Sequence, residues 1–223
     1  MSITRYGYRH AVSGFFEFPT ENAKLLLPSH LEPVELHHGT SIFSLTAFEF
    51  TESIVGSYGE LVASVIVVPL IRSGERFPKS AFYPYLVATT TREAREHAIE
   101  RWHLPHFMED VEMAFSLKQG EMTVKVAGGG SPIAEMAITE HAAAPVSHLY
   151  QCFMSNGSGS YLARITMEGE QSEHEDERGR LTLFDHPFHG NLDVEDVATA
   201  PFREMWMRDG QQLFDPLQRL GPA

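Results

Sequence analysis

Hydrophobic and polar residues alternate along much of this chain, which is the pattern of β-strands with one buried face. The alternation is regular over residues 41–50, and residues 111–117 and 121–126 alternate on either side of a Lys-Gln-Gly turn. Residues 149–154 and 161–167 flank a second polar turn, Ser-Asn-Gly-Ser-Gly-Ser. Because short polar turns join neighbouring antiparallel strands, each of these two pairs of segments predicts a β-hairpin.

Other segments predict strands in different surroundings. Residues 58–70 are apolar on both faces, which is typical of a strand in the middle of a sheet. Residues 1–18 predict a strand pair, and single strands are predicted at 82–88, 133–138 and 181–186. About ten short strands with few helices favour a mainly β fold, in which one highly curved antiparallel sheet forms a barrel.

Two segments predict helices. The first begins with Thr20 as a candidate N-cap and is stopped by Pro28. The second begins at Thr91, another candidate N-cap, and carries an apolar stripe at helical spacing that ends in Trp102. Pro105 is predicted to end this helix, because the residue before a proline is pushed out of the α-helical conformation.

Three stretches are predicted to lack regular structure. Residues 168–180 are strongly charged and predict an exposed, mobile loop. In the tail, residues 192–197 predict a turn that leads to an edge segment, and residues 202–217 carry apolar residues at mixed spacing that indicate no definite element. The glycines at 128–130 predict a turn, because they lack the lysine and the helix that would follow in a phosphate-binding loop.

Composition and charge limit the classes of function. The 223 residues carry a formal net charge of −13, which argues against nucleic acid and anionic membranes as partners because both attract positive charge. No apolar run approaches the roughly 20 residues that span a bilayer, and residues 1–14 lack the apolar core of a signal peptide. The sequence therefore predicts a single cytoplasmic domain over residues 1–223. One cysteine, Cys152, allows no internal disulfide and forms no metal motif.

The loop after the second predicted helix resembles the active-site segment of acetoacetate decarboxylases, whose pattern is roughly G-R-E-L-W-G-F-P-K-K. Glu100, Trp102 and Pro105 match this pattern. His106 stands where the family has its Schiff-base lysine, and Phe107 stands where that lysine has its neighbour. The loop therefore resembles a site that has lost the family's nucleophile.

Further motifs match the same superfamily in the same order along the chain. They are Leu31-Glu32-Pro33, Tyr58-Gly59-Glu60, the hairpin over residues 149–165 and Leu183-Phe184-Asp185-His186. Arg9 precedes Pro28 at the spacing of the family's active-site arginine. On these motifs the chain is identified as a divergent member of the acetoacetate decarboxylase-like superfamily. The resemblance implies a conical β-barrel flanked by helices, and it implies assembly into homo-oligomers.

The resemblance also implies a site. In the family a lysine forms an imine with a β-keto acid, while glutamates and an arginine position the substrate and move protons. Arg9 and Glu60 would remain here, and His106 would act with them as general acid or base. Tyr58, Trp102 and Phe107 would shape the substrate pocket.

The sequence thus predicts a small-molecule enzyme that uses acid–base catalysis without an imine. It would act on a carbonyl-bearing acid or a polyketide-like substrate, as a lyase or as an isomerase or cyclase, and secondary metabolism is the expected setting. No cofactor and no metal ion are predicted.

Several alternatives stay open at this stage. The chain could be a non-catalytic protein that binds a small ligand on the same scaffold, or an imine-forming decarboxylase that uses Lys79. His106 could be a capping or surface histidine at a helix end, and Glu60 could be a buried ion-pair partner of Arg9 with only a structural role. His186 and His189 are spaced like a metal cluster, although the resemblance explains the first of them as part of a fold motif.

Overall fold

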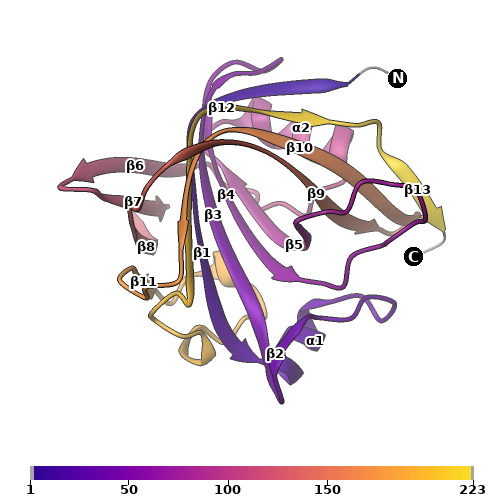
Figure 1. Ribbon diagram of the computed structural model, residues 1–223, viewed down its shortest axis with the longest axis horizontal. Helices are drawn as coiled ribbons and strands as arrows, with labels where there is room; N and C mark the ends of the chain where they lie inside the picture. The colour runs from indigo at the N-terminus through magenta and orange to yellow at the C-terminus, as the bar shows by residue number, and fades with distance from the viewer. Residues whose placement is uncertain (1–2, 222–223) are drawn as a thin grey trace.

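The computed structural model describes residues 3–221, which fold into two β-sheets and two α-helices (Figure 1). The helices are α1 (Thr20–Leu26) and α2 (Arg92–Trp102). The strands are β1 (Thr4–Pro19), β2 (Glu35–His37), β3 (Thr40–Glu52), β4 (Tyr58–Ile66), β5 (Ser80–Thr89), β6 (Val111–Lys118), β7 (Glu121–Gly128), β8 (Ser131–Thr139), β9 (Ala144–Asn156), β10 (Gly159–His174), β11 (Arg180–Leu183), β12 (Arg203–Phe214) and β13 (Gln218–Gly221).

Seven strands close into a barrel in the order β1-β12-β10-β9-β5-β4-β3, and pairing of β3 with β1 completes the ring. Every neighbouring pair is antiparallel except β5 and β9, which run parallel over residues 80–82 and 150–152. The prediction of a mainly β fold with one curved barrel is therefore confirmed, with a single parallel pair as the exception. The two predicted hairpins, β6–β7 and β9–β10, are also confirmed.

A second sheet with the strand order β11-β8-β7-β6 packs against the outside of the barrel, at the left of Figure 1. Leu45 and Val65 from the barrel share one hydrophobic core with Met122, Val124 and Met136 from this small sheet. The barrel wall is thus buried on its outer face here and lines the interior on its inner face. This double burial explains why β4 is apolar on both faces, as the sequence predicted for a strand inside a sheet.

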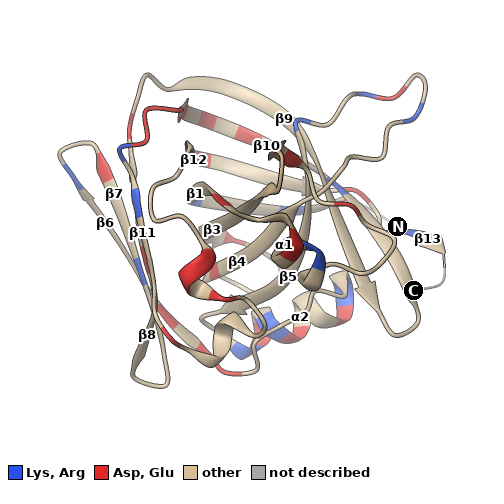
Figure 2. Cartoon of the chain, turned by 90° about the horizontal axis from the view of Figure 1, so that it is seen from below, with Lys and Arg blue, Asp and Glu red and all other residues tan. Residues whose placement is uncertain are grey.

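Charged residues lie on the surface formed by α2 and by the small sheet. Figure 2 shows basic and acidic residues interspersed along both. Neither helix in the part of the chain that the structure describes has the length and hydropathy required to cross a membrane.

The start of helix α1 differs from the prediction. Thr20 is the first helical residue, and Pro19 occupies the N-cap position without a side-chain cap. The hydroxyl of Thr20 instead lies 2.9 Å from the hydroxyl of Ser41 on β3. The Thr20 side chain therefore links the start of the helix to the barrel by a hydrogen bond. Local sequence does not reveal this contact, because Ser41 lies on another element.

Helix α2 begins as predicted and ends differently. The Thr91 hydroxyl accepts a hydrogen bond from the Ala94 N–H, which confirms the N-cap. The helix ends at Trp102 because His103 takes up a left-handed conformation at φ 56°, and its N–H donates to the Ile99 carbonyl. Pro105 lies beyond this stop, and its carbonyl accepts from the Val87 N–H, so the loop runs beside β5.

The structure differs from the sequence prediction in three further segments. Residues 4–19 form one continuous strand, β1, and not a strand pair. The charged stretch 168–180 is not a loop throughout, because β10 continues to His174 and buries Ser172, whose hydroxyl accepts the His141 N–H. The unassigned tail contains β12, a barrel strand of twelve residues.

Candidate active site

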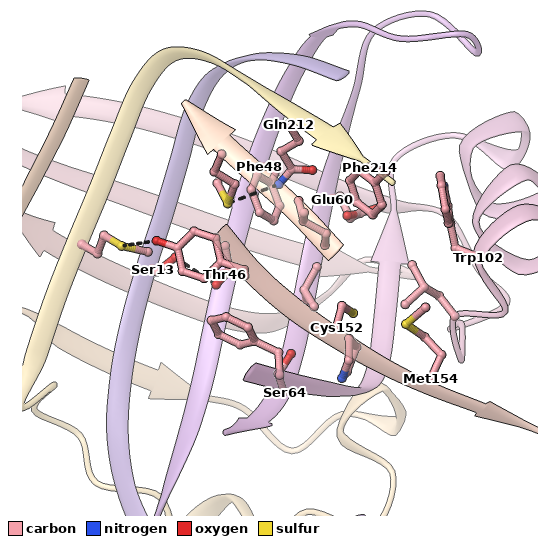
Figure 3. A pocket seen from close by; sticks show the side chains of 18 residues that line it. Ser13, Thr46, Phe48, Glu60, Ser64, Trp102, Cys152, Met154, Gln212 and Phe214 are labelled. Carbon is pink, nitrogen blue, oxygen red and sulfur yellow. Dashed lines mark hydrogen bonds between the residues drawn. The ribbon is translucent and has the colours of Figure 1, made fainter. Parts of the chain in front are cut away.

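The barrel encloses a cavity of about 100 Å³, which gives room for a molecule of a few heavy atoms (Figure 3). Its wall is largely aromatic and aliphatic. The aromatic lining consists of Phe48, Phe82, Trp102, Tyr150 and Phe214. Such a wall excludes water and strengthens any electrostatic interaction inside it.

Strand register explains which residues face this cavity. Residues directly opposite one another on antiparallel strands share a face of the sheet. Phe48 on β3 is paired with Glu60 on β4, and Thr46 is paired with Val62 and with Ser13 on β1. All five line the cavity. The Ser13 and Thr46 hydroxyls lie 2.9 Å apart and satisfy each other.

Glu60 is the one acidic residue in this wall. Burial raises the pKa of its carboxyl to about 8. Within residues 3–221, Glu60 makes no hydrogen bond or ion pair that would stabilise its charged form. At pH 7 the carboxyl is therefore mainly a neutral acid, with roughly one molecule in ten ionised.

Two hydrogen-bond donors in the wall have only weak partners. The Tyr150 hydroxyl faces the sulfur of Met205 at 3.8 Å, and the Gln212 amide faces the sulfur of Met167 at 3.8 Å. Thioether sulfurs are weak acceptors, so both donors can turn to a ligand oxygen at little cost. Figure 3 shows Gln212 and Glu60 close to Phe214.

The cavity wall carries no positive charge. No lysine, arginine or histidine is found among the lining residues of the described chain. Cys152 also lines the cavity, and burial raises the pKa of its thiol, with the nearby Glu60 acting in the same direction. The thiol is therefore protonated at neutral pH and is not an activated nucleophile.

A smaller cavity of about 20 Å³ adjoins the first and shares Glu60, Trp102 and Gln212 with it. Tyr58 lies in this side cavity, together with His97 of helix α2. Three of the residues that the sequence assigned to the site, Glu60, Trp102 and Tyr58, are thus brought together around two connected cavities.

Arg9 lies elsewhere, on the outer face of the barrel. Its guanidinium pairs with the Glu49 carboxylate at 2.8 Å, and its side chain is 58% exposed. Ser13 faces the cavity, so strict alternation along β1 would turn Arg9 inward as well. A β-bulge between Tyr8 and His10 shifts the alternation by one residue, turning Tyr8 inward and Arg9 outward.

His106 is also absent from the cavity wall. Its Nδ1 donates to the Phe107 carbonyl at 2.8 Å, and its buried Nε2 has no partner among the described residues. Burial lowers the pKa of His106. The positive charge of Arg95 acts in the same direction, and the negative charge of Asp110 opposes it. Phe107 packs in the outer core, with its ring 6.0 Å from that of Phe188. The structure does not bring Arg9, Glu60 and His106 together.

None of the four lysines lines either cavity. Lys79 forms an ion pair with Glu173 and lies 3.4 Å from the His148 ring. The lysines at positions 24, 118 and 125 are exposed on the surface. Lys79 is therefore engaged in an ion pair outside both cavities, which does not favour the imine alternative.

The two histidines that resemble a metal cluster bind the backbone. His186 accepts the Phe188 N–H at Nδ1, and its Nε2 lies 3.3 Å from the Gly128 carbonyl. The Nε2 of His189 bonds the Ile133 carbonyl. Within residues 3–221 there is no group of three or more histidines, cysteines or acidic residues that could hold a metal ion.

Sequence reasoning missed several wall residues. Tyr6 and Tyr150 occupy alternating positions of predicted strands, and such a position could have suggested an inward face. Gln212 lies in the tail for which the pattern indicated no element, so no sequence signal pointed to it.

Comparison with known proteins identifies the fold. No family model and no curated protein sequence matches the chain. Solved structures do match it over almost its whole length. An acetoacetate decarboxylase from Legionella pneumophila superposes with a TM-score of 0.69 at 14% identity, covering 99% of this chain and 88% of that one.

Two further structures agree. An acetoacetate decarboxylase-like enzyme from Sphingomonas wittichii gives a TM-score of 0.62 at 14% identity, covering 99% of this chain and 94% of that one. The enduracididine biosynthesis enzyme MppR, complexed with pyruvate, gives a TM-score of 0.62 at 11% identity, covering 98% and 90%. The chain therefore has the fold of the acetoacetate decarboxylase-like enzymes, as the sequence motifs predicted.

Proposed function

We propose that this protein is an acid–base enzyme that moves a proton next to the carbonyl group of a small, uncharged and largely apolar substrate. The observation that carries this proposal is Glu60, a carboxyl without a hydrogen-bond partner in an apolar cavity, whose pKa is raised to about 8. A carboxyl with a pKa near the working pH can both donate and accept a proton. Proton transfer of this kind is the chemistry of isomerases, cyclases and dehydratases.

The charge of the wall narrows the substrate class. A β-keto acid would bring its carboxylate beside Glu60 without any cation to compensate it, and burying an unpaired charge is costly. Pyruvate, found in the complex of MppR, supports a carbonyl compound as the substrate, but its carboxylate would find no cation among the described lining residues of this cavity. Of the two substrates predicted from the sequence, a carbonyl-bearing acid and a polyketide-like compound, the cavity favours an uncharged compound of the second kind.

The reaction follows from the arrangement of the polar groups. The ionised form of Glu60 takes a proton from the carbon beside the substrate carbonyl. Tyr150 or Gln212 donates a hydrogen bond to the carbonyl oxygen, on which negative charge develops. The protonated Glu60 then returns the proton to another carbon, or it gives the proton to the leaving group as the enolate expels it, so that Glu60 is ionised again. Arg9 and His106 have no part in this proposal because neither lines the cavity.

The experiment is deuterium exchange into a neutral diketone, acetylacetone, followed by proton NMR in D₂O. We expect exchange faster than in buffer alone, and a rate that rises with pH through about 8 because only ionised Glu60 removes the proton. Replacement of Glu60→Gln should lower the enzymatic rate by roughly 10²–10⁴-fold.

Glu49→Gln, which removes a carboxylate on the outer face, is the matched control and should keep the rate. Acetoacetate tests the charge argument and should exchange or decarboxylate no faster than in buffer. Equal exchange of acetylacetone by the wild type and the Glu60→Gln variant would overturn the proposal.

A second candidate is a non-catalytic ligand-binding protein. It is favoured by the scarcity of reactive groups, since Glu60 is the one group that titrates near neutral pH among the described residues that line the main cavity. Under this alternative, quenching of Trp102 fluorescence would report ligand binding in both the wild type and Glu60→Gln, and neither would accelerate exchange. The single domain, the cytoplasmic location and the homo-oligomer stay predictions.

A further inference from the structure

A second polar network lies beside the cavity and plays no part in the chemistry above. The Tyr6 hydroxyl lies 2.7 Å from the indole nitrogen of Trp102 and 2.7 Å from Nε2 of His97. An indole N–H can only donate, so the Tyr6 oxygen accepts it. When His97 is neutral with its proton on Nδ1, Nε2 is an acceptor, and the hydroxyl proton of Tyr6 is directed to it.

The network lies between the protein surface and the side cavity that Glu60 also lines. His97 is partly exposed on helix α2, whereas Tyr6 is only 3% exposed. Tyr6, His97 and Glu60 all line the 20 Å³ side cavity. This volume is enough for one water molecule, which needs polar partners of the kind that these side chains supply. A bridge from the Tyr6 hydroxyl to the Glu60 carboxyl thus fits the space.

The Tyr6 hydroxyl has two orientations, and His97 selects between them. Neutral His97 accepts the hydroxyl proton. Protonated His97 carries a proton on Nε2 and becomes a donor, so that the Tyr6 oxygen accepts from both His97 and Trp102. The hydroxyl proton must then turn into the side cavity, on the side where Glu60 lies.

We propose that His97, Tyr6 and a water molecule in the side cavity form a proton relay between the surface and Glu60, with His97 as the outer, positioning residue. For a proton leaving the cavity, Glu60 gives its proton to the water, and the water gives one to the Tyr6 oxygen. Tyr6 gives its own proton to His97 Nε2, and His97 releases one to solvent. Each group ends with the protons that it had before, except Glu60, which becomes ionised.

The charges around His97 suit a relay that works near neutral pH. Burial lowers the pKa of His97, Arg101 acts in the same direction, and Glu100 opposes them. Across the side cavity it faces Tyr6 of β1 and Tyr58 and Glu60 of β4. His97 is therefore mainly neutral at pH 7 and can accept a proton from Tyr6.

The test is a double-mutant cycle with the pKa of Glu60 as its readout, followed by the infrared carbonyl band of its protonated carboxyl. His97→Leu removes the acceptor without changing charge near pH 8, so the Tyr6 hydroxyl is free to turn inward and donate to ionised Glu60. We expect the Glu60 pKa to fall by about one pH unit. In a Tyr6→Phe background the same His97→Leu change should leave that pKa unaltered.

A pH-jump measurement tests the transfer itself. Tyr6→Phe should slow the appearance of the Glu60 band by about tenfold or more. Tyr161→Phe is the control, because the Tyr161 hydroxyl contacts Ser158 away from both cavities and its removal should change neither quantity.

An equal pKa shift by His97→Leu in both backgrounds, or an unchanged relaxation rate in Tyr6→Phe, would overturn the relay. If Tyr6→Phe does not fold, His97→Leu alone decides the matter: besides the pKa shift, removal of the outer acceptor should slow the appearance of the Glu60 band by about tenfold or more, and an unchanged rate would overturn the relay. The relay rests on Glu60 as the titrating group of the proposed function, but its readouts require no turnover. Failure of the relay, seen in the Glu60 pKa and the relaxation rate, can therefore be distinguished from failure of the enzymatic proposal, seen in deuterium exchange.

Discussion

At the scale of single residues, Glu60 has a consequence for stability as well as for chemistry. Its pKa rises from an ordinary 4.5 to about 8 on folding because the carboxyl is buried. Between these values the folded protein holds a proton that the unfolded chain has released. Since the native state then binds more protons, the free energy of unfolding falls as the pH rises through this window.

We therefore expect the wild type to lose roughly 3 kcal/mol of unfolding free energy between pH 5 and pH 8 relative to Glu60→Gln, which has no titrating carboxyl there. Urea unfolding at several pH values measures this difference. Glu49→Gln controls for the loss of a surface carboxylate and should follow the wild type. Parallel profiles for the wild type and Glu60→Gln would contradict the raised pKa.

At the scale of single elements, helix α2 matters most for the proposed function, because it positions both Trp102 and His97. Its Thr91 cap satisfies the Ala94 N–H, one of the free donors at a helix start. Thr91→Ala should lower the free energy of unfolding by about 1 kcal/mol, whereas Thr91→Ser keeps a hydroxyl and should cost much less.

Chemical denaturation of the three proteins measures this effect, and the quenching of Trp102 fluorescence by acrylamide reports whether the end of the helix loosens. Equal stability of the Thr91→Ala and Thr91→Ser variants would show that the cap contributes nothing.

The elements also show why the sequence predicted part of the fold and missed part. Local signals were sufficient for the hairpins and for the Thr91 cap, because turn residues and capping hydroxyls act on their immediate neighbours. Strand β12 was missed because its residues alternate between two buried environments, and Gln212 is a polar residue that faces inward.

The candidate site was predicted in part, for a related reason. Glu60 and Trp102 were found because they sit in recognisable motifs on regular elements. Arg9 was placed wrongly inside the barrel by spacing alone, since a β-bulge depends on pairing with β3 and leaves no mark in local sequence. For His106 the prediction placed the end of the helix at Pro105. In the structure the helix already ends at His103, so His106 lies further from the helix end than expected.

At the scale of the whole molecule, the barrel and the small sheet are joined by more than their shared apolar core. Glu204 of β12 is fully buried, yet it is saturated with hydrogen bonds. Its carboxylate accepts from the Thr139 N–H at 2.6 Å and the Thr139 hydroxyl at 2.9 Å, at the end of β8. It also accepts from the N–H groups of Arg178 and Gly179, both at 2.8 Å, just before β11.

This one carboxylate thus ties a barrel strand to two strands of the small sheet. Glu204→Gln replaces an acceptor oxygen by an NH₂ group that faces backbone donors, so buried N–H groups lose their partner. We expect a loss of about 2–3 kcal/mol of unfolding free energy, measured by urea denaturation. Amide exchange should accelerate relative to the wild type in β8 and β11, and less so in β4. Glu175→Gln, at an exposed carboxylate on the same side of the molecule, should cost less than about 1 kcal/mol. If Glu204→Gln were as stable as this control, the shared apolar core alone would hold the two sheets together.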